Sequence, residues 1–487
     1  MKKMTSLLSL LLALPMMACG GSGSGSETPS GEGTSASGSV KIEALNVDNT
    51  KPLSAQNQVI YEMNVGCMTP EGTFKAATAK LADLRKLGID IVWLMPIYPR
   101  GGGIDSPYAA TDFKAVNPSY GSVADVKAFV IEAHRLGMKV WLDWVPNHTA
   151  TNHRWVKEHA DYYTKDSNGQ MVHPNNYGDV FQLDYSNPAL VKAMNDCLFY
   201  WIDQADIDGY RCDYISSPKI PANYWQDIIP RLKAHKKGLV VMGEGDLTDR
   251  NNQRLQGVGF DFDYAWKYQE GILYRSFGPQ ATDAAALQTQ LEDFISTSSK
   301  MSNDRMTYLT NHDQNYNDGG RSLNKMYGEN VNALTTLVFT LYGMPLIYNG
   351  QETGNDQILD YFHDTKIKWT IGNRKMYNTL RTLIALKHTQ KALSHGTAAQ
   401  RGSLKWLTTG NKSVMAYERE KDGNKVVVVL NFGTAQQTVT LKELTGGSYV
   451  QWLDSKTIAS GPESRQLKLD SGTKITLGAK GYAVFVK

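Results

Sequence analysis

Short apolar runs alternate with helix-length amphipathic stretches over most of the chain. The helical stretches include residues 74–87, 123–136, 190–204 and 331–341. The apolar runs have the length of buried strands, and they cover residues 59–65, 89–95, 139–145, 207–213, 239–244, 260–264, 305–310 and 345–349. Eight such strand and helix units in one chain favour a (β/α)8 barrel, a TIM barrel of the α/β class, over an open doubly wound sheet.

Two regions depart from this alternation. The interval after the third strand is unusually long and rich in His, Asn, Tyr and Gly, which predicts a subdomain over residues 149–186, inserted on a loop between strand and helix. Beyond residue 396 the helical period gives way to alternating segments such as 425–432. We therefore expect a barrel domain over residues 40–395 and an antiparallel β-sandwich domain over residues 396–487.

The N-terminal sequence is typical of an export signal. Two lysines precede an apolar run over residues 7–17, which is too short to span a bilayer but fits a secretory signal peptide over residues 1–18. Residues 16–20 (MMACG) resemble the lipobox of bacterial lipoproteins, in which the Cys, here Cys19, becomes the lipidated first residue of the mature chain. This resemblance implies a lipid anchor to the bacterial envelope, on the periplasmic side or at the cell surface; an ordinary cleaved signal peptide is the alternative.

A flexible linker is expected after the signal, over residues 19–39. From residue 20 to residue 39, 14 of 20 residues are Gly or Ser, and such a composition cannot bury a core. The sequence therefore predicts a globular body on a tether, with the membrane contacted only through the lipid.

Composition and charge exclude several classes of protein. The chain has 51 Lys and Arg against 48 Asp and Glu, a net charge of +3, whereas a surface that follows nucleic-acid phosphates carries a strong basic excess. Cys67, Cys197 and Cys212 are odd in number and lack CxxC spacing, so we expect buried thiols rather than disulfides or a zinc site. We expect a monomer without an organic cofactor.

The predicted strands end in polar strings, and reactive side chains of a barrel gather where its strands end. The third strand ends in DWVPNH (143–148), the fourth in GYRCD (209–213), the fifth in VVMGE (240–244) and the seventh in TNHD (310–313). Because strand side chains alternate, Arg211 and Asp213 share one face and Cys212 points to the other. The same parity places Glu244 on the face of Val240 and Met242.

Three carboxylates therefore converge on one mouth: Asp213, Glu244 and Asp313. Each acid alone is more often a solvated loop residue or a member of an ion pair. Together they are hard to explain as structure, because like charges in close quarters resist joint ionisation. Their position beside an Arg and two His points to acid–base chemistry.

These strings resemble the signatures of the α-amylase family of glycoside hydrolases, family thirteen. DWVPNH, GYRCD, the Glu of GEGD (243–246) and TNHD match the first to fourth signatures, and QLDYSNP (182–188) matches the short signature that closes the inserted B domain. The order of the strings, their strands and the insertion after the third strand also agree. The resemblance extends from about residue 55 to the end of the chain.

The resemblance implies a role for each acid. Asp213 is expected to be the nucleophile, kept ionised by Arg211, and Glu244 the general acid and base. Asp313 is expected to grip sugar hydroxyls and favour a distorted ring. We expect the nucleophile and the acid to lie about 5 to 5.5 Å apart, which implies retention of the anomeric configuration through a covalent glycosyl-enzyme intermediate.

The resemblance also implies substrate-binding residues. His148 and His312 match the family's hydroxyl-binding histidines, and Tyr108 matches the Tyr whose ring stacks on the sugar being cleaved. Asp143 matches the Asp of the first signature, and we expect it to act through hydrogen bonds to Arg211 or its neighbours. The alternative for each histidine is a structural role in a loop, and the alternative for Tyr108 is an aromatic residue of the core.

Calcium is implied by the same comparison. Family enzymes often clamp the B domain with Ca²⁺, here through Asn147 and Asp184, whose oxygens suit the ion. After Asp213, however, the chain reads Tyr-Ile-Ser-Ser, where many α-amylases have a Lys-His pair that touches the leaving-group sugar and lends a carbonyl to the calcium. A metal-free hydrogen-bonded junction is the alternative.

The expected function is hydrolysis of α-1,4-glucosidic bonds in starch, glycogen or maltodextrins. Gly245 and Asp246 follow the acid where Trp or Asn is common, which leaves the fine specificity open. A cyclomaltodextrinase or neopullulanase, an oligo-α-1,6-glucosidase and a transglycosylase are alternatives within the family. A non-catalytic surface glycan-binding lipoprotein is disfavoured, because all three acids are present.

Overall fold

The computed structural model describes residues 41–48, 50–316 and 320–487. The predicted signal peptide and linker, residues 1–39, lie outside these described residues. Within the described ranges, no helix is both long enough and apolar enough to cross a bilayer.

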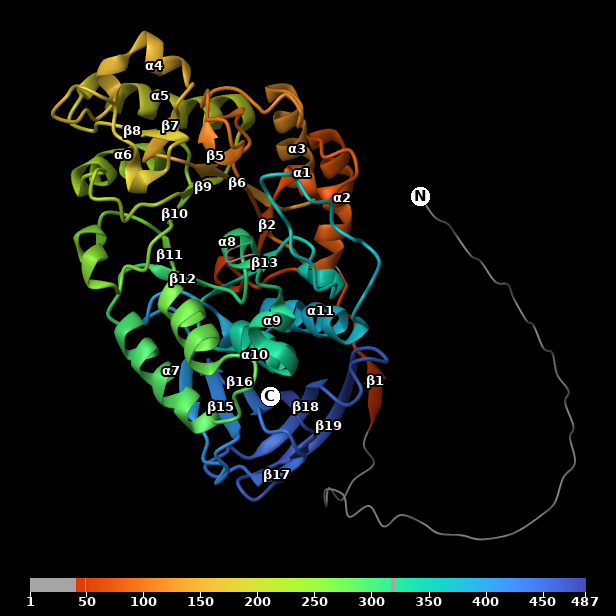
Figure 1. Cartoon of the computed structure of the whole chain (residues 1–487). Coiled ribbons are helices and arrows are strands. Elements are labelled where there is room, and N and C mark those ends of the chain that lie inside the picture. The colour runs from red at the N-terminus through yellow and green to blue at the C-terminus, as the bar shows by residue number, and fades with distance from the viewer. Residues whose placement is uncertain (1–40, 49, 317–319) are drawn as a thin grey trace, which may run out of the picture. The chain divides into compact units, whose positions relative to one another are not determined.

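Eight parallel strands close into a barrel, as the sequence predicted (Figure 1). Each lies within one of the predicted apolar runs or within one residue of it. In chain order they are β2 (Ile60–Met63), β3 (Ile91–Leu94), β6 (Lys139–Trp144), β9 (Gly209–Cys212), β10 (Val240–Gly243), β11 (Phe262–Tyr264), β12 (Asp304–Thr307) and β13 (Met344–Tyr348), and β13 pairs with β2 to close the ring. The observed strands are shorter than most of the runs, because the last residues of several runs belong to the loops of the mouth.

Helices follow most of the strands, and local capping sets their ends. The helix predicted over residues 74–87 is α2 (Phe74–Leu87): Thr73 accepts a hydrogen bond from the Ala76 N–H at its start, and Gly88, at φ 108°, ends it in the left-handed conformation that favours Gly. The other long helices are α3 (Val123–Arg135), α5 (Pro188–Ala205), α6 (Ala222–His235), the π-helix η5 (Lys267–Phe277), α7 (Ala284–Ser298), α10 (Val331–Thr340) and α11 (Arg374–Thr389). Short helices are α1 (Val65–Met68), α4 (Arg154–Glu158), α8 (His312–Tyr316) and α9 (Leu323–Tyr327).

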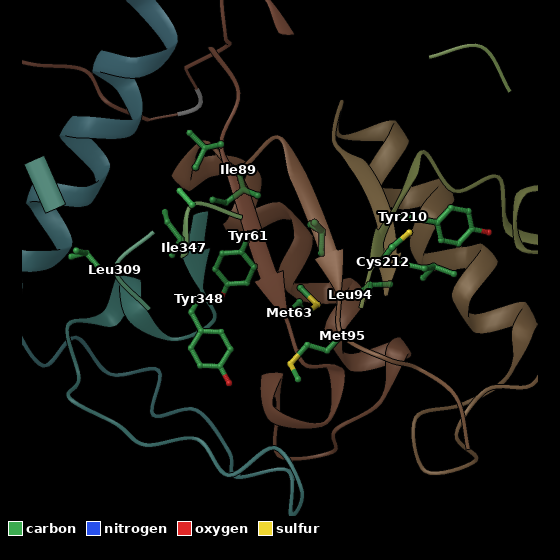
Figure 2. Packing of buried hydrophobic residues seen from close by; sticks show 14 of the residues in the cluster. Tyr61, Met63, Ile89, Leu94, Met95, Tyr210, Cys212, Leu309, Ile347 and Tyr348 are labelled. Atoms are coloured by element: carbon green, nitrogen blue, oxygen red, sulfur yellow. The ribbon is translucent and has the colours of Figure 1, made fainter. Parts of the chain in front are cut away.

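Alternate side chains of the barrel strands build two separate layers. The interior is filled by Ile60, Ile91, Trp93, Trp141, Met242, Tyr264, Met306, Tyr308, Met344 and Leu346. The intervening side chains belong to the larger core that includes the buried residues of the surrounding helices, and Figure 2 shows Met63, Leu94, Tyr210 and Cys212 among them. Cys212 thus lies on the opposite face from Arg211, as the parity predicted, and the free thiols of Cys67, Cys197 and Cys212 are buried.

Two small two-stranded sheets lie in the loops that follow β3 and β6. The first pairs β4 (Arg100–Gly101) with β5 (Ser106–Ala110). The second pairs β7 (His148–Ala150) with β8 (Val180–Gln182) and forms the base of the segment inserted after β6, which ends where α5 begins. An inserted segment at this point is what the long polar interval in the sequence predicted.

The C-terminal region is an antiparallel sheet, also as predicted. Its strands are β14 (Ser403–Trp406), β15 (Val414–Lys421), β16 (Asn424–Asn431), β18 (Gly447–Asp454), β19 (Glu463–Leu469) and β21 (Tyr482–Val486), and the pair β17 (Gln437–Thr440) and β20 (Lys474–Leu477) forms a second, small sheet. Residues of both sheets share a separate apolar core. Against the barrel, Tyr417 shares a 2.6 Å hydrogen bond with the Thr340 hydroxyl, and Arg419 donates to the Thr340 carbonyl at 3.0 Å.

One strand departs from the predicted division of the chain. Strand β1 (Ile42–Ala44) pairs antiparallel with β19, at the edge of the C-terminal sheet. The predicted barrel domain begins at residue 40, but these residues belong to the sheet instead. The sequence of a strand of only three residues carries too little pattern to predict its partner.

Candidate active site

Three neighbouring strands bring the predicted polar residues together. Strand β9 lies between β6 and β10 in the barrel, and Arg211 pairs in register with Asp143 on one side and Met242 on the other. Asp213 and Glu244 directly follow β9 and β10. The backbone N–H of Glu244 donates to the Cys212 carbonyl at 2.8 Å, so the ladder continues to the site.

The Arg211 guanidinium is the centre of the site. It is fully buried, its Nη1 lies 2.8 Å from Asp143 Oδ1 and 3.1 Å from Asp213 Oδ1, and its Nη2 lies 3.0 Å from Glu244 Oε2. Because one planar group contacts both Asp213 and Glu244, these two carboxyl groups lie side by side. The sequence predicted this proximity, and it also predicted that Asp143 would contact Arg211.

Burial shifts the protonation of these acids. It raises the pKa of Asp213 to about 6, although the Arg211 charge opposes the shift. Burial also raises the pKa of Glu244 to about 7, against Arg211 and with help from the negative charges of Asp213 and Asp313. Near neutral pH the pair therefore favours an ionised Asp213 beside a protonated Glu244, the division of labour between a nucleophile and a general acid.

The two oxygens of Glu244 have different surroundings. The backbone N–H of Tyr214 donates to Oε2 at 2.8 Å, and Arg211 addresses the same oxygen. Tyr214 has φ 43°, a left-handed conformation that is costly for a residue with a large side chain. The Tyr214 N–H on Oε2, together with the nearby Arg211 charge, leaves Oε1 as the oxygen that carries the transferable proton.

A second chain of hydrogen bonds runs along the other side of the site. The Tyr108 hydroxyl donates to Asp143 Oδ2 at 3.0 Å and lies 2.8 Å from His312 Nε2. His312 Nδ1 lies 2.5 Å from Glu62 Oε1, and its Nε2 lies 3.3 Å from Asp313 Oδ1. Burial alone would lower the pKa of His312, but the charges of Asp313 and Glu62 outweigh it and raise that pKa to about 9. His312 is therefore a cation that orients Asp313.

Several residues of the site were missed by the sequence interpretation. Glu62 is fully buried beneath His312, and an acid within the apolar run 59–65 is a signal that could have found it. Tyr264 accepts a 3.0 Å hydrogen bond from Arg211 Nε. Tyr361, whose ring centre lies 5.4 Å from that of His312, comes from the loop after β13, where no motif marks it.

His148 lies at the start of the inserted segment. It is partly buried, and burial lowers its pKa to about 4, so it is neutral at physiological pH. Its Nδ1 lies 3.2 Å from the Asn147 amide nitrogen. No contact in the structure joins it directly to Asp213 or Glu244, whereas Tyr108, Arg211, Asp143, His312 and Asp313 form one connected network.

The two predicted calcium ligands are engaged in hydrogen bonds. The Gln182 amide donates to the Asn147 carbonyl at 2.7 Å and to Asn147 Oδ1 at 3.0 Å. Asp184 Oδ1 accepts from the backbone N–H and the hydroxyl of Ser186, at 3.0 and 2.7 Å. The described part of the chain contains no group of three or more His, Cys, Asp or Glu side chains that could hold a metal ion. The Gln182 amide contacts both oxygens of Asn147, as in the metal-free hydrogen-bonded junction that the sequence leaves as the alternative to calcium.

Comparison of the chain with models of known protein families identifies its family. The model of the α-amylase catalytic domain matches residues 46–182 and 175–413, and the model of the maltogenic amylase C-terminal domain matches residues 404–483. The chain belongs to the α-amylase family. The matched catalytic region contains all the site residues described above.

Curated relatives of this α-amylase-family chain include enzymes with different names. The α-amylase MalA of Haloarcula japonica is 27% identical over 82% of the chain and 58% of the relative. A cyclomaltodextrin glucanotransferase of a Bacillus species is 25% identical over 84% of the chain and 60% of the relative. The chain thus spans about three fifths of the length of these relatives.

Solved structures of the family match nearly end to end. A maltogenic α-amylase from Thermotoga neapolitana has a TM-score of 0.73 and 25% identity, over 88% of the chain and 99% of that structure. An α-amylase from Lactobacillus plantarum has a TM-score of 0.69 and 26% identity, over 89% and 99%. These similarities agree with the barrel, the inserted segment and the C-terminal sheet described above.

Proposed function

We propose that the chain is a retaining glycoside hydrolase that cleaves α-1,4-glucosidic bonds of starch, glycogen or maltodextrins. The observation that carries this proposal is the single Arg211 guanidinium that contacts both Asp213 and Glu244. Paired carboxyl groups held this close leave no room for a water between the nucleophile and the sugar, which is the arrangement of retaining enzymes.

The proposed reaction has two steps. The Asp213 carboxylate attacks the anomeric carbon while Glu244 gives its proton to the leaving oxygen, so that the glycosidic bond breaks and a glycosyl ester forms. Glu244, now ionised, takes a proton from water, and the resulting hydroxide attacks the same carbon and releases Asp213. Asp313 and the His312 cation hold sugar hydroxyls during both steps, and the ring of Tyr108 stacks on the sugar.

The names of the relatives support the substrate class. Those compared above are α-amylases, a maltogenic α-amylase and a glucanotransferase that forms cyclomaltodextrins. The match of residues 404–483 to a maltogenic amylase C-terminal domain favours small maltooligosaccharide products as a second possibility within the same chemistry.

The experiment measures both the bond cleaved and the configuration of the product. Purified protein is incubated with soluble starch, pullulan and isomaltose, and products are separated by chromatography while proton NMR follows the first anomer released. We expect reducing sugars from starch with initial α configuration. Initial β product contradicts retention, cleavage of isomaltose alone favours the α-1,6 alternative, and absence of all cleavage favours a glycan-binding protein.

We also propose that the chain is exported, anchored through a lipid on Cys19 and active as a monomer. The charged start, the apolar run and the MMACG string support this proposal. Substituting Cys19→Ser should move the protein from the membrane fraction to the soluble fraction after cell lysis. An unchanged distribution contradicts the anchor, and light scattering of the purified protein tests the monomer.

A further inference from the structure

A buried cluster of charges lies behind Glu244, outside the network that contacts the substrate-binding mouth. Arg305, on β12, directs Nη2 to Asp246 Oδ1 at 2.6 Å and Nε to Asp263 Oδ1 at 2.9 Å. Arg305 is 4%, Asp246 6% and Asp263 0% exposed. Burying charged groups costs desolvation free energy, so the role of this cluster is indicated by the backbone groups that it binds.

The cluster fixes the loop that immediately follows Glu244. Asp246 Oδ1 also accepts from the N–H and the hydroxyl of Thr248, at 3.0 and 2.5 Å, and its Oδ2 accepts from the backbone N–H of Lys267 at 2.9 Å. Asp263 Oδ2 accepts from the backbone N–H of Leu247 at 2.8 Å. Two carboxylates that share one guanidinium thus satisfy three backbone donors, two from the loop itself and one from η5.

Glu244 is therefore held from both directions along the chain. On its N-terminal side the strand ladder holds its own N–H. On its C-terminal side Gly245 passes so close to Ile215 that an added Cβ would lie 3.1 Å from that side chain, and Asp246 then anchors the chain to Arg305. The same Arg305 donates to the Tyr264 carbonyl at 3.0 Å, while the Tyr264 hydroxyl contacts Arg211.

We propose that Arg305, Asp246 and Asp263 are positioning residues that place the Glu244 carboxyl for proton transfer to the leaving oxygen. This inference rests on the proposed function and explains why Gly-Asp follows the acid here: the short Gly allows the close approach to Ile215, and the Asp is the partner of Arg305. A displacement of about 1 Å at a reacting group costs about 100-fold in rate.

The test uses two substrates that differ in their need for an acid. Phenyl α-maltoside has a poor leaving group that requires protonation, whereas dinitrophenyl α-maltoside leaves with little help. The variants are Asp246→Asn and Arg305→Lys, the second of which keeps the charge but loses the fork that spans two carboxylates. The readout is kcat/KM, which reports the step that breaks the glycosidic bond, with folding checked by circular dichroism and Tm.

Asp90 offers a matched control, because it directly precedes β3 at the end of the barrel opposite the mouth. It is 1% exposed, and it pairs with Arg85 at 3.0 Å and with His388 at 2.8 Å while accepting from the Val59 N–H. Asp90→Asn removes the same charge from a comparable buried cluster that touches none of the site loops. We expect it to lower Tm and to change kcat/KM on both maltosides by less than about 3-fold.

The inference predicts a loss that depends on the leaving group. In Asp246→Asn and Arg305→Lys, kcat/KM should fall about 10- to 100-fold on the phenyl glycoside and less than about 3-fold on the dinitrophenyl glycoside. If the wild-type protein is active and the two variants lose kcat/KM equally on both glycosides, or lose none, the positioning role is wrong and the proposed function stands. If the wild-type protein cleaves neither maltoside nor starch, the proposed function itself is wrong.

Discussion

The two ends of the barrel hold buried charges in opposite proportions. At the mouth, one guanidinium faces three carboxyl groups, those of Asp143, Asp213 and Glu244. At the other end, the Asp90 carboxylate faces two basic partners, Arg85 and His388. A buried acid with enough basic partners is stabilised in its ionised form and stabilises the fold. Buried acids that share one basic partner have raised pKa values, which suits them to proton transfer.

The strongest test of this contrast removes one acid from the crowded end. Asp213→Asn should lower kcat/KM on starch about 10⁴-fold, because the nucleophile is gone. Its stability should not fall: burial raises the pKa of Asp213 to about 6, above its unfolded value, so the acid stabilises the fold only while protonated and loses this contribution as the pH rises through about 6. A Tm at pH 8 below that of the wild-type protein contradicts the contrast.

The next largest effect concerns the acid itself. Glu244→Gln should lower kcat/KM about 10³-fold on a poor leaving group, because the amide cannot transfer a proton. The loss on dinitrophenyl α-maltoside should be much smaller for the first step, and stopped-flow release of the phenol measures it. Equal losses on the two substrates would assign the role of proton donor elsewhere.

The Asp90 cluster at the other end of the barrel should respond in the opposite way. Asp90→Asn leaves Arg85 and His388 without their shared buried anion, and breaking such a cluster costs about 3 kcal/mol. Urea unfolding of this variant and of Asp213→Asn, at pH 7, compares the two ends directly. Two variants of equal stability would show that the proportions of charge do not matter.

The pH profile sharpens the comparison without any mutation. Activity should fall below about pH 6, where Asp213 gains a proton, and above about pH 7, where Glu244 loses one. The two acids interact, so the limbs of the kcat/KM profile belong to the pair. In Asp313→Asn, which removes a negative charge that raises the Glu244 pKa, the basic limb should move to lower pH.

The smallest expected effect concerns calcium. Since Gln182 occupies the oxygens of Asn147, EDTA should leave Tm unchanged, and added Ca²⁺ should not raise it by mass action. Gln182→Ala removes the amide donor and should lower Tm with or without EDTA. A chelator-dependent drop in the wild-type protein would support the calcium site implied by the family.

Local pattern was sufficient to predict the barrel strands and the helices α2, α3, α5 and α10, because period and capping act over a few residues. It also placed Arg211, Asp213 and Glu244 together, since neighbouring strand ends meet at one mouth. It did not find the pairing of Arg305 with Asp246 and Asp263. Those partners lie 59 and 42 residues apart in the chain, and the sequence around a single charged residue does not indicate which distant residue it pairs with.

The pairing of β1 with β19 constrains how the molecule is made. Ile42 lies opposite Arg465, so the first described strand emerges from the ribosome more than four hundred residues before its neighbour exists. Every barrel strand can find its partners earlier than that. The edge of the C-terminal sheet can therefore form only after β19 is available, when strands from the first and the last part of the described chain pair.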